Sequence, residues 1–343
     1  MLNATITGTG MYVPPRVVTN DDLVNDYGID TTNEWIVKRT GIEERRFADE
    51  GIGTSDLALE ASKQALEDAG IEAHDLDLIV FATLSPEYSF PGAGVFLQEK
   101  LGLCEGENAK FVPALDIRNQ CSGFIYGLSM AAAQVRCGMA KHVLLVGAET
   151  HSSGLDMTTR GRAVNSLFGD GAGAVIVSAT EEDKGIRGWW LGADGRFKDN
   201  LKQSIFDIRQ RPMIPVDEDG NGIVSPDMLW PHMDGRIVFK HAVTRMITVL
   251  MQACWEQGIT AEDIDLFCFH QANKRINEYV ADQLNIPPEK LVHNIQKFGN
   301  TTAATIPLLL AESTRNGKLK PGMKVAMVAF GAGFTWGCSI VDW

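Results

Sequence analysis

The sequence predicts an α/β fold in which helices cover buried, largely parallel sheets. Short apolar runs alternate along the chain with longer amphipathic ones, which is the pattern of strands and crossover helices. The apolar runs are continuous, so each sheet is expected to be covered on both faces. The expected strands lie at 78–82, 143–147, 174–177, 266–269 and 325–329, and the expected helices at 55–69, 122–136, 238–256, 272–284 and 302–315.

A weak internal repeat divides the chain into two similar parts. Residues Gly70–Phe81 resemble Gly258–Phe269, and each segment ends a helix and enters a strand. Cys121 opens one apolar helix and Asn300 opens another, and both helices lead into a strand through a similar Gly-Met segment. Chance similarity between helix-to-strand turns is the alternative explanation. We predict two halves of one architecture, 1–180 with the cysteine and 181–343 with the histidine and asparagine.

Composition and charge exclude several classes of function. The 343 residues carry a net charge of −13, which argues against general nucleic-acid binding. The longest apolar runs have the length of strands and fall short of the ~18 residues of a membrane helix. The first residues show no secretory signal, so we expect a cytoplasmic protein without a membrane partner. The six cysteines contain no C-x-x-C pair, which predicts reduced thiols and no metal site.

The polar, proline-containing segment Arg196–Asp234 interrupts the α/β pattern. It predicts a long excursion over the surface or over a site. Within it, Asp217–Gly222 copies the first half of a calcium-binding loop. The twelfth position of that loop is Met228, where a bidentate glutamate is required. We therefore predict an Asp/Gly turn here and no calcium site.

Cys121 is the strongest candidate for a nucleophile. A strand-like segment gives way directly after it to an apolar helix that contains Gly123 and Gly127. Backbone N–H groups and the positive end of the helix dipole favour a thiolate at such a position. A thiolate is the form that attacks a thioester. An ordinary buried thiol is the alternative, and that is our interpretation of Cys137, Cys254, Cys268 and Cys338.

Two further polar residues and one loop are candidates for the same site. His270 ends a predicted strand, where sites collect in parallel sheets, although a hydrogen-bonded core histidine is the alternative. Asn300 reads by itself as a helix cap, and its match to the position of Cys121 is what recommends it. The glycine-rich loop Phe330–Gly337 follows the last strong strand and offers backbone N–H groups for an oxyanion hole. The glycine-rich segment Phe168–Gly173 precedes a strand, so we reject it as a dinucleotide site.

Taken together, these motifs resemble beta-ketoacyl-acyl-carrier-protein synthase III. The resemblance rests on Cys121 in its strand-to-helix turn, His270–Asn273, Gly299–Thr301 and Phe330–Gly337, and it runs almost from end to end. It includes the segments Asn33–Ile42 and Leu167–Gly173. The family implies a thiolase-type, five-layered αβαβα fold built from two pseudo-equivalent halves, and a homodimer.

The resemblance also implies roles for individual residues. Cys121 matches the acyl-accepting nucleophile, while His270 and Asn300 match the pair that stabilises the enolate formed by malonyl decarboxylation. His270 is expected to act as a neutral donor, because decarboxylation supplies the nucleophile without a base. Further implied roles are the oxyanion hole for Cys121 and Ala332, decarboxylation support for Phe330, coenzyme A binding for Trp35, Arg39, Arg162 and Asn273, and the partner's acyl pocket for Phe90.

The implied activity is a decarboxylative Claisen condensation of an acyl-CoA primer with a malonyl thioester. No permanently bound cofactor is expected, and the expected partners are coenzyme A thioesters and an acyl carrier protein. Lys240 and Arg275 are candidates for docking that acidic carrier, although Asp282 and Gln283 stand where some members carry lysines. Arg118–Gln120 precede the cysteine where the family usually has small residues, so the shape of the acyl pocket stays open.

Other functions remain open at this level. One is a different acyltransferase or condensing enzyme of the same superfamily, acting in secondary metabolism. Another is a Cys-His-Asn thioester hydrolase or amidase, which would need a water path and a base beside the thiol. A calcium-binding scaffold is disfavoured by Met228.

Overall fold

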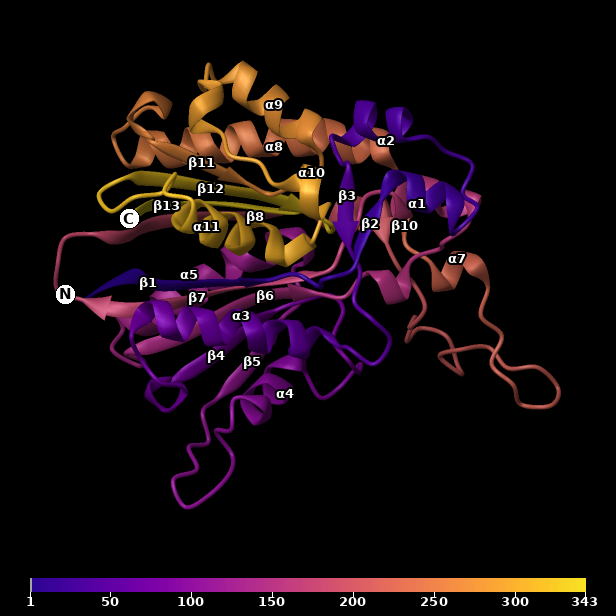
Figure 1. Ribbon diagram of the computed structural model, residues 1–343, viewed down its shortest axis with the longest axis horizontal. Coiled ribbons are helices and arrows are strands. Elements are labelled where there is room, and N and C mark those ends of the chain that lie inside the picture. The colour runs from indigo at the N-terminus through magenta and orange to yellow at the C-terminus, as the bar shows by residue number, and fades with distance from the viewer. Residues whose placement is uncertain (1) are drawn as a thin grey trace.

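The computed structural model describes residues 2–343, which form two mixed sheets stacked with helices (Figure 1). In the first sheet, β4 lies parallel to both of its neighbours, β5 and β6, whereas β7 runs antiparallel to β6 and to β1. Strand β5 forms one edge of this sheet and β1 the other. The order is β1 (Asn3–Tyr12), β7 (Gly171–Thr180), β6 (His142–Glu149), β4 (Leu78–Ala82) and β5 (Ala114–Ile117).

The second sheet repeats the topology of the first. Its order is β11 (Leu266–Phe269), β12 (Lys324–Gly331), β13 (Thr335–Asp342) and β8 (Gly185–Ala193). A parallel pair is followed by two antiparallel pairings, as for β4, β6, β7 and β1, and the first sheet adds β5. All strands of the first sheet end by Thr180, and those of the second begin at Gly185. On this basis we keep the division near residue 180 as a proposal.

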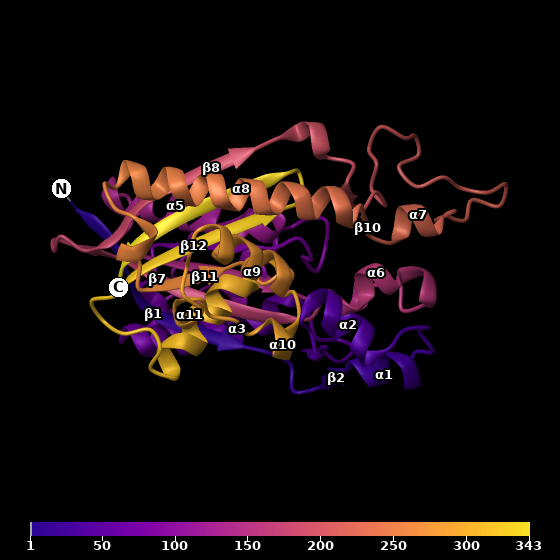
Figure 2. The ribbon, with the colours of Figure 1, turned by 90° about the horizontal axis from the view of Figure 1, so that it is seen from above.

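Helices complete five layers. Helices α5 and α11 lie between the two sheets and share one apolar core with both of them (Figures 1 and 2). Helices α3 and α4 cover the outer face of the first sheet, and α8 and α9 cover that of the second. The bounds are α3 (Thr54–Ala69), α4 (Ala93–Lys100), α5 (Gly123–Arg136), α8 (Gly235–Glu256), α9 (Lys274–Gln283) and α11 (Thr305–Arg315). The predicted αβαβα architecture is confirmed.

Helix α8 has 22 residues and is long and apolar enough, by length and composition alone, to cross a membrane. The sequence prediction concerned uninterrupted apolar runs, and charged residues such as Arg236, Lys240 and Arg245 interrupt those of α8. The helix packs against β12, β13 and α9, and its buried side chains include Met246, Val249 and Leu250. Burial in an outer layer of the fold is sufficient to account for its apolar composition.

Short elements gather at one end of the sheets, beside the ends of β4, β6, β11 and β12 (Figures 1 and 2). They supply many of the side chains of the site described below. They are β2 (Val17–Thr19), α1 (Asn20–Asn25), α2 (Asn33–Thr40), β3 (Glu44–Arg46), α6 (Arg162–Asn165), β9 (Leu201–Lys202), α7 (Pro226–Leu229), β10 (His232–Met233) and α10 (Ile295–Phe298).

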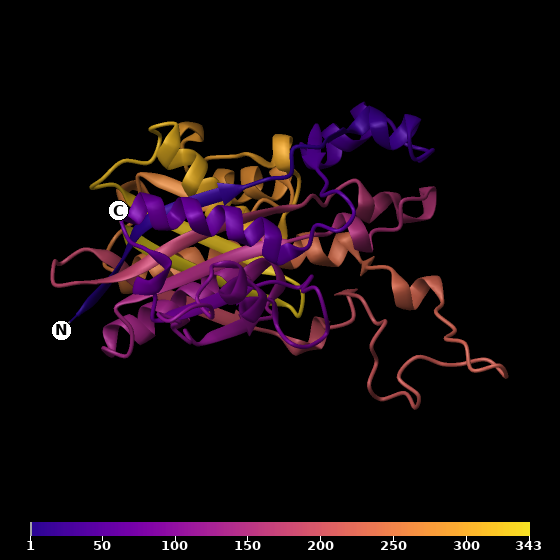
Figure 3. The ribbon, with the colours of Figure 1, turned by 60° about the horizontal axis from the view of Figure 1, so that its bottom comes forward.

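The predicted excursion extends away from the layered body as a long arm around α7 (Figure 3). The Asp217 carboxylate accepts hydrogen bonds from the backbone N–H groups of Asp219 and Asn221, at 3.0 and 2.8 Å. Gly220 adopts a positive φ of 84°, and the flanking residues Val216 and Gly222 form a bridge. The segment is thus a turn that is stabilised by hydrogen bonds from backbone N–H groups to the Asp217 carboxylate.

Candidate active site

Cys121 lies in a 3₁₀ turn, Gln120–Ser122, that joins β5 to α5. The side chain is only 8% exposed. The last residue of β12, Gly331, packs closely against this turn, because a Cβ added to it would lie 2.8 Å from the Cys121 Cβ and 3.0 Å from the Cys121 backbone nitrogen. The Ser122 hydroxyl lies 2.8 Å from that of Thr335. The nucleophile is therefore held between the two halves of the fold.

The second half contains an equivalent turn, but Asn300 does not occupy the place of Cys121. The 3₁₀ turn Thr302–Ala304 leads into α11 as Gln120–Ser122 leads into α5. Both turns begin with a residue at positive φ, 45° for Gln120 and 49° for Thr302. Cys121 therefore corresponds to Ala303, and Asn300 lies two residues before the turn. The sequence matched Cys121 to Asn300 instead of Ala303, because a helix cap and a 3₁₀ turn cannot be told apart in the sequence.

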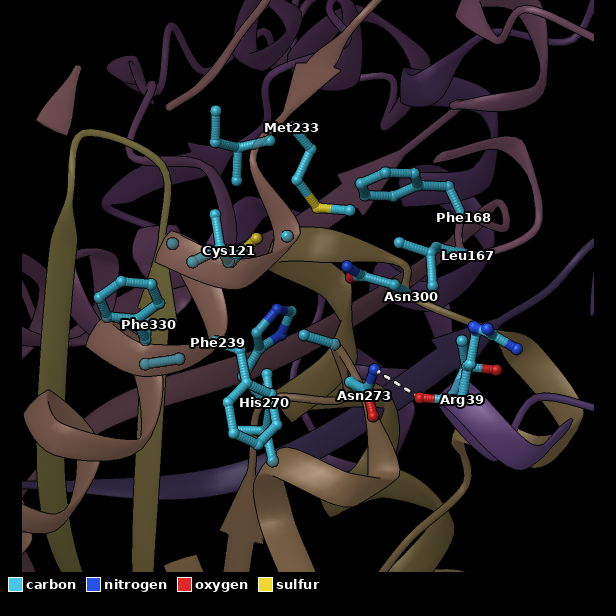
Figure 4. Close-up of a pocket in the computed structure, with 18 of the residues that line it drawn as sticks. Arg39, Cys121, Leu167, Phe168, Met233, Phe239, His270, Asn273, Asn300 and Phe330 are labelled. Atoms are coloured by element: carbon cyan, nitrogen blue, oxygen red, sulfur yellow. Dashed lines mark hydrogen bonds between the residues drawn. The ribbon is translucent and has the colours of Figure 1, made fainter. Parts of the chain in front are cut away.

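His270 and Asn300 nevertheless reach the same cavity as Cys121 (Figure 4). His270 follows β11, and its backbone N–H donates to the carbonyl of Val328 at 2.8 Å. The Asn300 Oδ1 atom accepts the N–H of Thr302 at 2.9 Å, which leaves the Nδ2 amide free to donate. The Nε2 atom of His270 is buried and makes no hydrogen bond within residues 2–343.

Burial dominates the protonation of these groups. It raises the pKa of the Cys121 thiol to about 12, and the nearby Glu149 carboxyl adds to the effect. The expectation of a thiolate stabilised by the helix terminus is thus opposed by desolvation. Burial also lowers the pKa of His270 to about 3, so this imidazole is neutral at working pH. A neutral His270 agrees with the role expected from the sequence.

Two cavities meet at Cys121. The first has a volume of about 350 Å³, and its walls include His270, Asn300 and Phe330 (Figure 4). Its walls also include Trp35, Arg39 and Asn273. The second has a volume of about 630 Å³ and lies on the other side of the thiol. Its walls include Gln120, His151, Phe168, Thr302 and Ala332. Cys121 therefore lines both cavities, so the thiol is within reach of a group bound in either one.

The expected coenzyme A residues cluster at the first cavity. The guanidinium carbons of Arg39 and Arg162 lie 4.1 and 5.0 Å from the centre of the Trp35 ring. Asn273 caps α9 and donates from Nδ2 to the carbonyl of Arg39 at 3.0 Å. A base stacked between Trp35 and Arg162 needs roughly 3.5 Å on each side, so Arg162 has to move outward to admit one.

The remaining expected residues lie at the surface. Phe90 is 85% exposed and lines neither of the two cavities at Cys121. Lys240 and Arg275 are exposed on α8 and α9, the neighbouring helices of one outer layer. Within residues 2–343, no group of three or more histidine, cysteine or acidic side chains is arranged to hold a metal ion.

Sequence reasoning missed three buried polar residues beside the nucleophile. Glu149 accepts hydrogen bonds from the hydroxyls of Ser85 and Thr83, at 2.5 and 3.1 Å. The Nε2 atom of His151 lies 2.7 Å from the hydroxyl of Thr302. Their hydrogen-bond partners are distant in the chain and cannot be paired from the sequence. Glu149 and His151 could have been noticed, because they are polar residues in apolar surroundings, whereas Thr302 has no such signal.

A buried thiol between two cavities, with a neutral histidine and an asparagine amide on one side, defines a condensing acyltransferase of the thiolase fold. Residues 115–195 match the family described as 3-oxoacyl-[acyl-carrier-protein] synthase III, and residues 254–343 match its C-terminal part. The chain is 41% identical over 342 residues to beta-ketoacyl-[acyl-carrier-protein] synthase III 1 of Bacillus anthracis, covering 100% of this chain and 99% of the relative.

Solved structures agree. The 3-oxoacyl-[acyl-carrier-protein] synthase III of Aquifex aeolicus superposes with a TM-score of 0.86 at 39% identity, covering 99% of this chain and 100% of the other. The Thermus thermophilus enzyme gives a TM-score of 0.87 at 39% identity, with 99% of both chains covered. The chain belongs to the beta-ketoacyl-acyl-carrier-protein synthase III family and is a condensing enzyme.

Proposed function

We propose that this enzyme carries a primer acyl group on Cys121 and condenses it with a malonyl thioester, giving a 3-oxoacyl thioester and carbon dioxide. The carrying observation is that Cys121 lies where two cavities meet, with His270 and Asn300 on the wall of the first. One cavity then holds the acyl chain while the other admits first the coenzyme A thioester and then the malonyl group.

In the first half-reaction, the Cys121 sulfur attacks the thioester carbonyl of acyl-CoA. The thiol proton passes to the leaving sulfur, so coenzyme A departs as a free thiol and an acyl-Cys121 thioester remains. The developing oxyanion requires two donors. The backbone N–H groups of Cys121 and Ala332 are proposed for this role, and the contact of Gly331 with the cysteine backbone supports it.

In the second half-reaction, the malonyl carboxylate leaves as carbon dioxide and its electron pair forms an enolate. The Nδ2 amide of Asn300 and the Nε2 atom of neutral His270 are proposed to donate to the enolate oxygen. The enolate carbon attacks the acyl carbonyl, the Cys121 sulfur leaves, and the thiol regains one proton. Phe330, on the wall of the same cavity, offers an apolar surface that favours loss of the charged carboxylate.

The finer assignments of partners are part of the same proposal. Arg39, Arg162, Trp35 and Asn273 are proposed to hold coenzyme A, and exposed Lys240 and Arg275 to dock the acidic carrier protein. Edge strand β5 and the 85% exposed Phe90 support pairing with a second copy. We propose a homodimer acting in the cytoplasm without a bound cofactor.

The test follows mass and carbon dioxide together. The enzyme is incubated with a panel of acyl-CoAs and its intact mass is measured, and labelled malonyl thioester is then added. We expect a single acyl adduct, then label in carbon dioxide, with return of the unmodified mass and a 3-oxoacyl product. Release of free acid as the sole product would support the hydrolase and reject the condensing reaction.

A further inference from the structure

The carboxylate of Glu149 joins the ends of two neighbouring strands beside the second cavity. Glu149 is the last residue of β6 and is fully buried. Strand β6 runs parallel to β4, and Ala82, the last residue of β4, pairs with Gly147. The Glu149 side chain therefore extends past the paired residues toward the segment that follows β4.

Four donors from that segment converge on one oxygen of the carboxylate. The hydroxyls of Ser85 and Thr83 donate to Oε2 at 2.5 and 3.1 Å, and the backbone N–H groups of Leu84 and Ser85 donate to it at 3.1 and 3.2 Å. The Ser85 contact has the length of a charge-assisted bond between a hydroxyl and a carboxylate. The Ser85 Oγ atom in turn accepts the backbone N–H of Thr150 at 3.0 Å, so the segment is fixed to the end of β6 twice.

The segment that Glu149 holds forms one wall of the second cavity. Leu84, Ser85 and Pro86 line this cavity together with Cys121, and Glu149 lies behind them. Because the polar groups of the segment are bonded to Glu149, the apolar side chains of Leu84 and Pro86 provide the surface for an acyl chain. The wall Leu84–Pro86 therefore depends on a residue outside the cavity.

The second half of the fold shows what the equivalent segment does. Strand β11 pairs with β12 in the same register as β4 with β6, which makes Thr83–Ser85 the counterpart of Gln271–Asn273. The latter segment lines the first cavity, beside the expected coenzyme A residues. The counterpart of Glu149 there is Gly331, which has no side chain to hold a segment. The carboxylate is thus particular to the half that forms the second cavity.

A side chain without an acceptor could not replace Glu149 silently. The donors of Thr83, Leu84 and Ser85 would be left unpaired, and an unpaired buried donor costs its full desolvation. The segment would then have to move until these groups found other partners or water. The position of the cavity wall is therefore tied to the Glu149 carboxylate.

We propose that Glu149 is a positioning residue that fixes the wall Leu84–Pro86 and so sets the length of acyl chain that the second cavity accepts. The inference rests on the proposed function, in which this cavity holds the primer chain while coenzyme A binds at the first. A fixed wall rejects chains that are longer than the cavity, whereas a released wall moves aside for them. Primer length is then controlled by a residue that the chain does not touch.

The test measures selectivity between primers. Acylation of Cys121 by a series of saturated acyl-CoAs, from acetyl to dodecanoyl, is followed by single-turnover intact mass. In Glu149→Ala we expect the rate ratio of the shortest rejected chain to the preferred chain to rise about tenfold, the typical discrimination for one methylene in a pocket. The Glu149 charge also raises the pKa of the Cys121 thiol, but altered thiol reactivity affects all primers alike and cancels in the ratio.

Companion variants separate this role from a general loss of stability. Thr83→Val removes one donor to Glu149 and should raise the same ratio by about threefold, whereas Thr83→Ser should restore it. Glu149→Gln keeps one acceptor oxygen and should lie between wild type and Glu149→Ala. Asp77→Ala is the matched control, because Asp77 accepts the backbone N–H groups of Lys141 and His142 at 2.7 and 3.1 Å, at the opposite ends of β4 and β6. Its ratio should equal that of wild type.

An unchanged or lower ratio in Glu149→Ala overturns the proposal, and so does an equal rise in Asp77→Ala. If Glu149→Ala does not fold, Thr83→Val decides, and a wild-type ratio there overturns the assigned role. The proposed function fails separately, through the absence of an acyl adduct on wild-type Cys121.

Discussion

The Nδ1 atom of His270 lies 2.7 Å from the hydroxyl of Thr305, and the opposite ring nitrogen, Nε2, is buried without a hydrogen-bond partner. The Thr305 hydroxyl also donates to the carbonyl of Thr302 at 3.0 Å. With its proton used there, the hydroxyl accepts from Nδ1–H, and Nε2 presents a lone pair. When the hydroxyl instead donates to Nδ1, the neutral ring carries its proton on Nε2, and Nε2 is then the donor that the proposed enolate step requires.

Thr305 is therefore expected to set the tautomer and the orientation of His270. In Thr305→Val the ring loses its hydrogen-bond partner, so we expect carbon dioxide release from malonyl thioester to fall about tenfold. Acyl transfer to Cys121 should stay within about threefold of wild type. Thr305→Ser, which keeps the hydroxyl, should restore most of the decarboxylation. Equal loss of both half-reactions in Thr305→Val would indicate a packing role instead.

Removal of the enolate donors should separate the two half-reactions further. Taking away one preorganised donor typically costs ~10²–10³ in rate. His270→Ala and Asn300→Ala should both still acquire an acyl group, since neither side chain hydrogen-bonds the thiol. Both should release carbon dioxide at a small fraction of the wild-type rate. Single-turnover acylation by mass, beside labelled carbon dioxide release, measures the two steps. Blocked acylation with normal decarboxylation in His270→Ala would reverse the assigned roles.

The identity of the nucleophile can be tested against a second thiol of the same chain. Cys121→Ser should show no stable acylation, whereas Cys137→Ser should be acylated like wild type. The sequence-based interpretation of Cys137 as a buried thiol was wrong, because this residue is exposed at the C-terminal end of α5. It lies far along the helix from Cys121, so it reports non-specific acyl transfer. Peptide mapping of the adduct makes the comparison. An acyl group mapped to any cysteine other than Cys121 would contradict the assignment.

The layers of the fold were predictable because their signals are local. The expected helix at 55–69 matches α3 at Thr54–Ala69, and the expected strand at 266–269 matches β11. Apolar periodicity reports such elements directly. The position of Asn300 could not be predicted as well, because Asn300 lies two positions before the turn that opens α11, and only the backbone shows where that turn begins.

The hydrogen bond between His151 and Thr302, near the nucleophile, could not be predicted from the sequence for a different reason. His151 and Thr302 are separated by 151 positions, and their hydrogen bond exists only because the two halves meet. Positive φ at Thr302 has no signature in a residue type that normally avoids it. The helix-terminus argument for Cys121 was sound in its direction, but the degree of burial that opposes it depends on the packed structure.

The proposed coenzyme A site predicts that replacing Arg162 and replacing its neighbour Arg160 will have different effects on the KM for acyl-CoA. The Arg162 guanidinium lies over the ring of Trp35, whereas the Arg160 guanidinium forms an ion pair with Asp156 at 2.7 Å. Arg162→Ala should raise the KM for acyl-CoA several-fold with little effect on kcat, because it removes binding that ground and transition states share. Arg160→Ala is the matched control. An unchanged KM for Arg162→Ala at low salt would count against the site.

The buried histidines predict that stability rises with pH on the acidic side. Burial lowers the pKa of His151 and His270 to about 3, whereas in the unfolded chain both titrate near 6.5. Between these values the unfolded chain binds the extra protons, and stability increases with pH wherever that is so. Glu149 acts in the opposite direction. Burial raises its pKa to about 7, so between roughly pH 4.5 and 7 the folded protein holds a proton that the unfolded chain has lost.

Two histidines outweigh one carboxyl, so the free energy of unfolding of the wild type should increase from pH 5 to pH 6.5. Glu149→Gln removes the opposing proton while it keeps an oxygen that can accept from Ser85 and Thr83. Its slope should therefore be steeper than that of the wild type, by roughly 1.4 kcal/mol per pH unit. Urea unfolding at pH 5, 5.5, 6 and 6.5 measures both slopes. A wild-type slope that matches that of Glu149→Gln would show that the Glu149 carboxyl is ionised in the folded protein, because only then does it bind no extra proton there.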